Sequence, residues 1–362
     1  MTKKAMLDEL RNRIDLIDRD LLRLLVRRME ISGEVGRSKR GEGISAYQPE
    51  REEEVLAGMI ALNKGNMLSN SALRAIYTEI MSASRALQEP ISVGFLGPEG
   101  TFSHIASVRH FGHSIKEVSQ KDIPQLFVNV EKGVLDFGVV PVENSMEGTV
   151  NASLDMFRHT NVRINAEILL KVVHNLVSVN GQAEDVSRIY SHPQPAAQCR
   201  KYLSMRFPDL EVLETQSSAI AAERAALDEK SAAIASEYAA KRFELKIIAT
   251  HIEDSPNNIT RFFVIGTRLS RKSAPSKTSI LFSLKDRPGA LYKALGSFSE
   301  NGINLSKVES RPTREKVWEY IFFIDMDGHA EDKPIKEALD DLDMQARFLK
   351  VLGSYPACRE VL

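Results

Sequence analysis

Cysteine is scarce in this chain of 362 residues, which has only Cys199 and Cys358 and no metal-ligand spacing around either of them. This scarcity fits a reducing cytoplasm and argues against a disulfide framework or a zinc site. No apolar run approaches the length of a membrane span, and the charged first residues lack the apolar core of a signal peptide. The formal net charge is only -1, so bulk charge gives no reason to expect nucleic-acid or membrane binding.

The length exceeds that of one ordinary domain, and the composition, 43% hydrophobic and 27% charged, is that of a globular protein. Changes in pattern along the chain predict three modules, at residues 1–89, 90–268 and 277–362. No organic cofactor or metal is expected from the motifs described below.

Apolar residues recur every seven positions near the start of the chain, which predicts one long helix from about Leu7 to Lys39. Arg28 falls on one of these apolar rows, where a charge needs a buried partner or a ligand. Lys39 lies eleven residues after Arg28, which places it about 20° from Arg28 around the same helix. The two rows are Leu7, Ile14, Leu21 and Val35, and Leu10, Ile17, Leu24 and Ile31.

Two further helices are predicted, one beginning at Pro49 and one running from about Ser69 to Leu87. Polar residues on apolar faces of the three helices point toward one interior, which suggests a pocket for an anionic ligand. The alternative is a dimerisation bundle with a few stray polar residues. The converging residues are Arg28, Lys39, Arg51, Glu52, Ser84 and Gln88.

Arg11 lies about 25 Å along the first helix from Arg28, at about 1.5 Å per residue. One helix cannot deliver both side chains to one small ligand, so Arg11 would serve such a pocket only from a second, antiparallel chain. On spacing alone, an exposed surface residue is the favoured interpretation of Arg11.

These residues resemble the all-helical chorismate mutase family, through Leu10-Arg11, Arg28, Lys39, Pro49-Glu50-Arg51-Glu52, Ser84 and Gln88. The resemblance covers the whole module and implies rearrangement of chorismate to prephenate, which needs a compact substrate conformer and cations rather than a base. It implies that Arg11 of a partner chain, Arg28 and Arg51 hold carboxylates, that Lys39 and Gln88 bind the ether oxygen, that Glu52 binds the ring hydroxyl and that Ser84 supports them. Gln48 stands where some members carry Asp.

Between residues 90 and 268, strands, polar loops and helices alternate, which predicts an α/β domain with ligands bound at strand ends near helix N-termini. Gly94, Gly97 and Gly100 lack the spacing of a dinucleotide-binding loop. Glu143 and Asn144 could also form a helix-capping pair. His104 and His192 lie near the loops, and each could be structural or catalytic.

The segment from Ile259 to Gly266 predicts a buried strand, because it is mostly β-branched and aromatic. Thr260 and Arg261 interrupt it, and together they suggest a site that binds an anion and hydrogen-bonds one more group. The alternative is an edge strand with both side chains in water.

Four motifs in this region resemble prephenate dehydratase: Gly97–Ser103, Pro141–Ser145, Ser191–Gln194 and Thr260-Arg261-Phe262. The resemblance implies a two-lobed α/β domain, like the periplasmic binding proteins, with the site in the cleft. It implies that Thr260 is catalytic, as a hydrogen-bond donor to the leaving oxygen, and that Arg261 binds substrate. Further cleft residues by resemblance are Glu143, Asn144, Ser145, Thr149, Ser191 and Gln198.

After a polar linker at residues 270–277, the predicted order βαββαβ indicates a ferredoxin-like α+β sandwich. The motifs Gly289-Ala290-Leu291-Tyr292 and Glu309-Ser310-Arg311-Pro312 resemble the phenylalanine-regulated ACT domain, with Tyr292 where the family often has Val. The alternative is a plain dimerisation domain. The resemblance implies that an amino-acid effector contacts Gly289, Ala290, Leu291, Glu309, Ser310 and Arg311.

Together the three resemblances predict a multidomain, bifunctional enzyme that converts chorismate to prephenate and then to phenylpyruvate. We expect inhibition by L-phenylalanine and a homodimer or higher homo-oligomer, with no nucleic-acid or membrane partner. Two rivals stay open: a mutase fused to an NAD-dependent prephenate dehydrogenase, and a non-enzymatic sensor of small anions.

Overall fold

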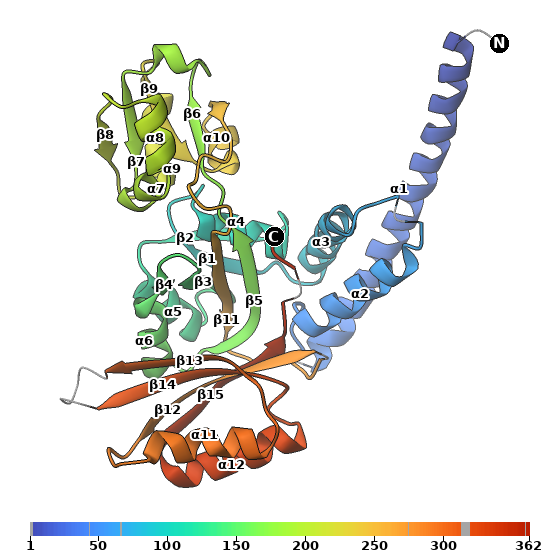
Figure 1. Cartoon of the computed structure of the whole chain (residues 1–362). Helices are drawn as coiled ribbons and strands as arrows, with labels where there is room; N and C mark the ends of the chain where they lie inside the picture. Colours follow the sequence, from blue (N-terminus) through green and yellow to red (C-terminus); the bar gives the residue numbers. More distant parts are fainter. Residues whose placement is uncertain (1–2, 43, 66, 274, 313–318, 359) are drawn as a thin grey trace. The chain divides into compact units, whose positions relative to one another are not determined.

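The computed structural model describes residues 3–42, 44–65, 67–273, 275–312, 319–358 and 360–362. Its chain forms two compact units (Figure 1). The first contains the residues up to Gln48, Glu54–Ile91 and Phe111–Lys116, and the second contains Pro49–Glu53, Ser92–His110 and Glu117–Leu362. Among the described residues, no helix is both long and apolar enough to cross a membrane.

The first unit is helical, and its three helices confirm the prediction: α1 (Lys3–Glu42), α2 (Pro49–Leu62) and α3 (Asn70–Gln88). Ser69 caps α3, because its side chain accepts a hydrogen bond from the Ala72 N–H at 3.1 Å. α1 meets α3 closely at Gly36, where an added Cβ would lie 2.8 Å from Cγ of Gln88. The absence of a side chain at Gly36 therefore allows these helices to approach.

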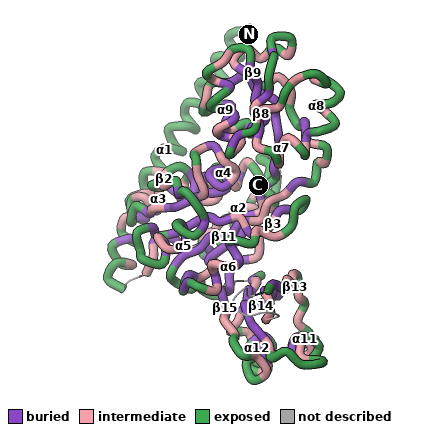
Figure 2. The backbone as a smooth tube through the Cα atoms, turned by 90° about the vertical axis from the view of Figure 1, so that its left-hand side faces the viewer, coloured by how far each residue is buried: buried purple, intermediate pink, exposed green. Residues whose placement is uncertain are grey.

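The two apolar rows of α1 are largely unburied in the single chain. Among the described residues of α1, only Ser32 and Gly36 are buried. All eight row residues are at least 43% exposed, and Figure 2 shows α1 exposed along most of its length. The heptad pattern therefore predicted the helix correctly, while the described part of the chain leaves its apolar stripe exposed.

The second unit begins with a two-lobed α/β region. The first lobe has a sheet in the order β2-β1-β3-β11-β5, with β4 paired to β3. β11 (Ile259–Gly266) lies between two antiparallel neighbours, so the edge-strand alternative is wrong. The other strands are β1 (Ser92–Leu96), β2 (Lys116–Gln120), β3 (Phe137–Asn144), β4 (Gly148–Thr149) and β5 (Arg163–Lys171), and the helices are α4 (Phe102–Phe111), α5 (Ile123–Glu131) and α6 (Asn151–His159).

The second lobe has a sheet in the order β10-β6-β9-β7-β8, and the chain passes between the lobes twice, after β5 and before β11. Small side chains such as Ala222 and Ala233 fill its core. Its strands are β6 (Asn175–Ser178), β7 (Arg188–Ser191), β8 (Val212–Glu214), β9 (Ser231–Ala235) and β10 (Lys246–Ala249), and its helices are η1 (Ala183–Asp185), α7 (Pro193–Gln198), α8 (Arg200–Arg206), α9 (Ser218–Ala226) and α10 (Glu237–Arg242).

β3 is longer than the sequence predicted, because the expected loop at residues 141–150 continues the strand to Asn144 and then returns as β4. Main-chain pairing with β11 extends it, and this pairing places Asn144 opposite Thr260. α6 begins at Asn151 with Val150 at its N-cap, so Glu143 and Asn144 do not cap that helix.

The C-terminal module has the predicted ferredoxin-like order, with sheet order β13-β14-β12-β15. The predicted strand over residues 317–326 begins outside the described residues, and its described part is β14. The elements are β12 (Ser276–Leu284), α11 (Ala290–Glu300), β13 (Leu305–Pro312), β14 (Tyr320–Asp327), α12 (Lys333–Gln345) and β15 (Ala346–Pro356).

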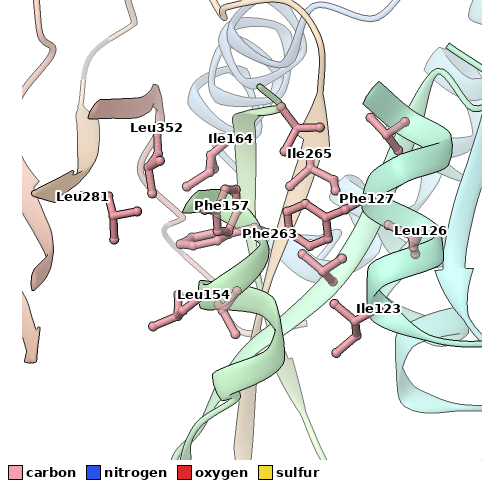
Figure 3. Packing of buried hydrophobic residues seen from close by; sticks show 14 of the residues in the cluster. Ile123, Leu126, Phe127, Leu154, Phe157, Ile164, Phe263, Ile265, Leu281 and Leu352 are labelled. Carbon is pink, nitrogen blue, oxygen red and sulfur yellow. The ribbon is translucent and has the colours of Figure 1, made fainter. Parts of the chain in front are cut away.

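One face of this C-terminal sheet shares a hydrophobic core with the first lobe. Leu281 and Leu352 of the module lie beside Phe157, Ile164 and Phe263 of the lobe (Figure 3). Full burial of each such side chain stabilises the folded state by about 1.5–3 kcal/mol. The residues between β11 and β12 therefore connect two packed bodies, because the C-terminal sheet is docked on the lobe.

Candidate active sites

A cavity of about 370 Å³ opens between the two lobes, within the usual size range of small-molecule sites. Its walls come from both lobes: the ends of β3 and β11, the N-terminal turn of α4, the short α7 and the start of α9. Asn144, Thr149, Gln198 and Thr260 line it. We call this cavity the cleft.

The amide of Asn144 has only one possible orientation, because its Oδ1 accepts hydrogen bonds from the backbone N–H groups of Met146 (2.9 Å) and Glu147 (3.2 Å). Its Nδ2 must then donate, and it donates to Oγ1 of Thr260 at 2.9 Å and to Oδ1 of Asn258 at 2.8 Å. Since the oxygen of Thr260 accepts this bond, the Thr260 O–H is available to donate to a bound molecule.

The same directionality continues into the second lobe. Asn258 donates from Nδ2 to Oε1 of Gln198 at 2.9 Å, so Nε2 of Gln198 donates to Glu147 at 3.1 Å. Nε2 of His174, 2.9 Å from the same Gln198 oxygen, must also be a donor. Burial lowers the pKa of His174 although the Gln198 bond opposes this, so the imidazole is neutral at pH 7 and its Nδ1 lacks a proton.

The described cleft wall has no Lys or Arg side chain that could bind an anion. The wall instead includes the start of α4, with Thr101 just before the helix and Phe102 and Ser103 within it, and the start of α9, with its N-cap Ser217 and Ser218. The unsatisfied N–H groups at such helix starts favour anions. The cleft can therefore hold a small carboxylate through neutral donors and helix ends.

In the helical unit, polar side chains from α1 and α3 contact one another between the helices. Arg28 donates to the hydroxyl of Ser84. Gln88 donates from Nε2 to Oγ of Ser32 at 2.8 Å, and Ser32 donates to the Ser84 carbonyl at 3.3 Å. Lys39 donates to the Ala46 carbonyl at 3.4 Å. A guanidinium, an ammonium and an amide thus lie along the inner side of this unit.

Family models match three consecutive parts of the chain: chorismate mutase type II over residues 10–89, prephenate dehydratase over residues 93–270 and the ACT domain over residues 278–343. A bifunctional chorismate mutase/prephenate dehydratase of Aquifex aeolicus (strain VF5) is 45% identical over 97% of this chain and 98% of that protein. One from Stutzerimonas stutzeri is 43% identical over 98% of this chain and 99% of that protein.

The chain belongs to the bifunctional chorismate mutase/prephenate dehydratases. A crystal structure of prephenate dehydratase from Arthrobacter aurescens in complex with L-Phe has a TM-score of 0.68 and 33% identity, and covers 74% of this chain and 90% of that chain. This membership confirms the predicted family, the three predicted fold classes and both predicted enzyme activities.

The dehydratase residues expected from the sequence divide into two groups. Thr260, Asn144, Thr149 and Gln198 line the cleft. Glu143, Ser145, Ser191 and Arg261 are not among its described lining residues. Ser145 instead joins β3 to the start of β11, because its hydroxyl donates to the Asn257 carbonyl (2.8 Å) and accepts from the Ile259 N–H (3.0 Å).

Arg261 points away from the dehydratase cleft. Thr260 and Phe262 line the cavity, so strand alternation directs Arg261 to the opposite face of the sheet. There its guanidinium pairs with Glu167 at 2.8 Å and with Asp325 at 2.5 Å. The expectation that Arg261 binds substrate therefore does not fit its position.

Asn258, His174 and Glu147 line the cleft but had no role in the sequence prediction. Asn258 directly precedes the predicted strand at Ile259, but a single amide beside a strand gives no signal by itself. His104 and His192 differ in their surroundings. His104 is structural, since Nδ1 accepts from Gly100 at 3.0 Å and Nε2 lies 2.9 Å from Glu117, whereas His192 lines the cleft and caps α7.

In the mutase unit, Arg28, Ser84 and Gln88 come together as expected, while Arg11 is 67% exposed and pairs only loosely with Asp8 at 3.7 Å. Gln48 occupies the N-cap of α2 without a capping hydrogen bond from its side chain. Arg51 and Glu52 lie in the first turn of α2, which belongs to the second compact unit.

In the ACT module, Gly289 adopts a positive φ of 79° at the N-cap of α11, with Ala290 and Leu291 following in the first turn. A positive φ is readily available to glycine and strained for other residues. Ser310 is exposed and Glu309 is half-buried. Arg311 is buried, and it pairs with Asp155 of α6 at 2.9 Å and donates to the Asn151 carbonyl at 2.7 Å.

Proposed function

We propose that the helical unit rearranges chorismate to prephenate, that the cleft converts prephenate to phenylpyruvate, and that L-phenylalanine bound by the ACT module inhibits the second step. The observation that carries this proposal is the Thr260 hydroxyl in the cleft wall. Its oxygen accepts a hydrogen bond from Asn144, so its hydrogen can be donated to a bound substrate. Cytoplasm is the compartment that we expect.

In the mutase step, one C–O bond breaks while one C–C bond forms, and no proton or electron has to be supplied. Arg28 and Arg51 would hold the two carboxylates, Lys39 and Gln88 would donate to the ether oxygen as it gains charge, and Glu52 would bind the ring hydroxyl. Such preorganised donors stabilise charge that develops in the transition state.

In the dehydratase step, the ring carboxylate leaves as CO2, its bonding electrons make the ring aromatic, and the ring hydroxyl departs with one added proton as water. We assign Thr260 as the hydrogen-bond donor to that departing oxygen. Asn144 fixes the direction of the Thr260 bond, while Thr149 and Gln198 shape the wall around the substrate.

A described cleft wall without Lys or Arg suits this chemistry. A cation paired with the departing carboxylate would stabilise the substrate more than the transition state, since that charge is lost as CO2 forms. Helix starts at α4 and α9 can instead hold the side-chain carboxylate, which persists in phenylpyruvate.

A second copy of the chain is the proposed partner for the exposed rows of α1. Ile17 and Leu24, at 65% and 61% exposed, lie near the middle of the stripe. An antiparallel α1 would cover this stripe and would bring the partner's Arg11 toward the site around Arg28. Ile17→Glu should then give a monomer in sedimentation with reduced mutase activity and near-normal dehydratase activity, and a dimeric variant would remove α1 as the interface.

Feedback inhibition is supported by the ACT family match and by the L-Phe complex of the Arthrobacter dehydratase. The Gly289 turn begins α11, and the N-terminus of a helix favours a negatively charged group such as an amino-acid carboxylate. Glu309 and Ser310 on β13 are the candidate partners of the amino group.

Turnover of chorismate by the purified full chain tests the proposal. We expect phenylpyruvate to form through prephenate without added NAD or metal, and L-phenylalanine to slow the second step. Accumulation of prephenate alone would contradict the proposed dehydratase function, and unaltered rates at saturating L-phenylalanine would contradict the proposed feedback inhibition.

A further inference from the structure

The two strands that carry Asn144 and Thr260 are also the strands on which the ACT module docks. In the register between β3 and β11, Thr260 lies opposite Asn144 and Arg261 lies opposite Glu143. Because side chains alternate along a strand, the first pair faces the cleft and the second pair faces the ACT module. Each catalytic-strand residue thus has a charged neighbour, one position away, on the ACT side.

Glu143 is held by Lys307 of β13, whose Nζ lies 2.8 Å from Oε1. The same ammonium donates to the hydroxyl of Thr149 at 3.4 Å, and Thr149 lines the cleft. Lys307 is only 11% exposed. One ACT side chain therefore contacts the wall of the dehydratase site directly.

Arg261 is held by a buried network from both modules. Its guanidinium pairs with Glu167 of β5 at 2.8 Å and with Asp325 of β14 at 2.5 Å, and donates to the Tyr355 hydroxyl at 3.2 Å. Asp325 also accepts from Ser279 at 2.5 Å, and it is fully buried. Burial disfavours the charge on Arg261, but Tyr355, Asp325 and Glu167 nevertheless raise its pKa, so the cation is maintained.

The strand that carries Lys307 also carries Glu309 and Ser310, two of the expected effector contacts. Arg311 anchors the far end of this strand to α6. β14, the neighbour of β13, supplies Asp325. A change of β13 and β14 on effector binding would therefore act on Glu143 and Arg261 at once.

We propose that the Lys307–Glu143 and Asp325–Arg261 ion pairs couple the ACT module to the dehydratase site, with Glu143 and Arg261 acting as positioning residues for Asn144 and Thr260. This inference rests on the proposed dehydratase role of Thr260. It changes the assigned role of Arg261 from substrate binding to coupling of the ACT module with the cleft. The coupling path is short, because Glu143 and Arg261 are adjacent in sequence to Asn144 and Thr260. Coupling of this kind is reciprocal, so prephenate and L-phenylalanine oppose each other's binding.

Five variants of the full chain test the coupling: Lys307→Met and Asp325→Asn, Lys307→Arg as the conservative change, and Lys333→Met and Asp343→Asn as matched controls on α12. Lys333 is 87% exposed and Asp343 is exposed. Dehydratase kcat and KM would be measured with and without L-phenylalanine, and effector affinity by calorimetry with and without a prephenate-site ligand such as phenylpyruvate.

We expect the coupling factor between L-phenylalanine and the dehydratase site to fall by about two- to thirtyfold in Lys307→Met and Asp325→Asn. Basal KM should rise in Lys307→Met, because Thr149 loses a donor, whereas basal kcat should fall in Asp325→Asn, because Thr260 shifts. Mutase activity should stay unchanged in both variants, both controls should resemble the wild type, and Lys307→Arg should restore coupling.

Wild-type coupling in both docking variants, with L-phenylalanine still bound, would overturn the inference while leaving the proposed function intact. If Asp325→Asn fails to fold, Lys307→Met alone decides. A wild type that L-phenylalanine does not inhibit would instead contradict the feedback proposal. The positioning role would then be judged on the basal KM and kcat, and values equal to those of the controls would overturn it.

Discussion

The helical unit and the cleft handle related dicarboxylates with different chemical means. Arg28, Lys39 and Gln88 supply charge and donors between α1 and α3. The described cleft wall has neither Lys nor Arg and relies on Thr, Asn and Gln side chains and on helix starts. On the proposed function, both sites act on oxygen that gains charge, but only the dehydratase must release a carboxylate as neutral CO2.

This contrast teaches that the reaction, rather than the charge of the substrate, sets the composition of a site. A rearrangement keeps both carboxylates, so cations can bind them in the ground and transition states alike. A decarboxylation loses one carboxylate, so a cation there would oppose the reaction. On the proposed function, such a site depends mainly on the orientation of neutral donors. The hydrogen bonds from the Met146 and Glu147 N–H groups to Asn144, and from Asn144 to Thr260, provide that orientation.

The largest separation of the two sites should come from Arg28→Ala. Loss of a guanidinium that holds a substrate carboxylate should lower mutase kcat/KM by about 10³-fold, because the carboxylate is left without its partner. Dehydratase rates measured with prephenate should not change. Comparable losses in both activities would show that the two sites are not chemically independent.

A smaller but sharper effect is expected from Asn144→Asp. The new carboxylate would accept the Thr260 hydrogen rather than donate to its oxygen, so the hydroxyl would turn away from the substrate. We expect dehydratase kcat to fall by about 10²-fold, with mutase turnover retained. Asn144→Asp with wild-type dehydratase kcat would contradict the proposed direction of this bond.

The smallest effect is expected from Gly36→Ala in the mutase unit. An added Cβ would lie 2.8 Å from Cγ and 2.9 Å from Cα of Gln88, so α1 and α3 would have to separate. Overpacking of this kind costs roughly 1–3 kcal/mol of unfolding free energy. Mutase kcat should drop by about tenfold as Gln88 shifts, and Gly33→Ala, which has only the flexible Arg37 nearby at 3.9 Å, serves as the control.

Much of the fold followed from local pattern. The strand Ile259–Gly266 has the predicted bounds, because a run of β-branched and aromatic residues acts locally. The direction of Arg261 could not be predicted. Alternation separates it from Thr260, but which face meets the cleft depends on the packing of distant strands.

Other features of the site are set by tertiary contacts. The extension of β3 to Asn144 arises from its pairing with β11, more than a hundred residues away along the chain. Asn258 and His174 carry no periodic or motif signal, and their roles emerge only where the two lobes meet. Docking of the ACT sheet was likewise hidden, since apolar residues on both faces of β12 look like an ordinary buried strand.

Dehydratase kcat of Thr260→Val compared with Thr260→Ser tests the central claim most directly. Valine keeps the shape of threonine without the hydroxyl, and serine keeps the hydroxyl without the methyl group. The account predicts a loss of about 10²- to 10³-fold for Thr260→Val, with prephenate accumulating from chorismate, and near wild-type turnover for Thr260→Ser. Equal kcat values for the two variants would contradict it.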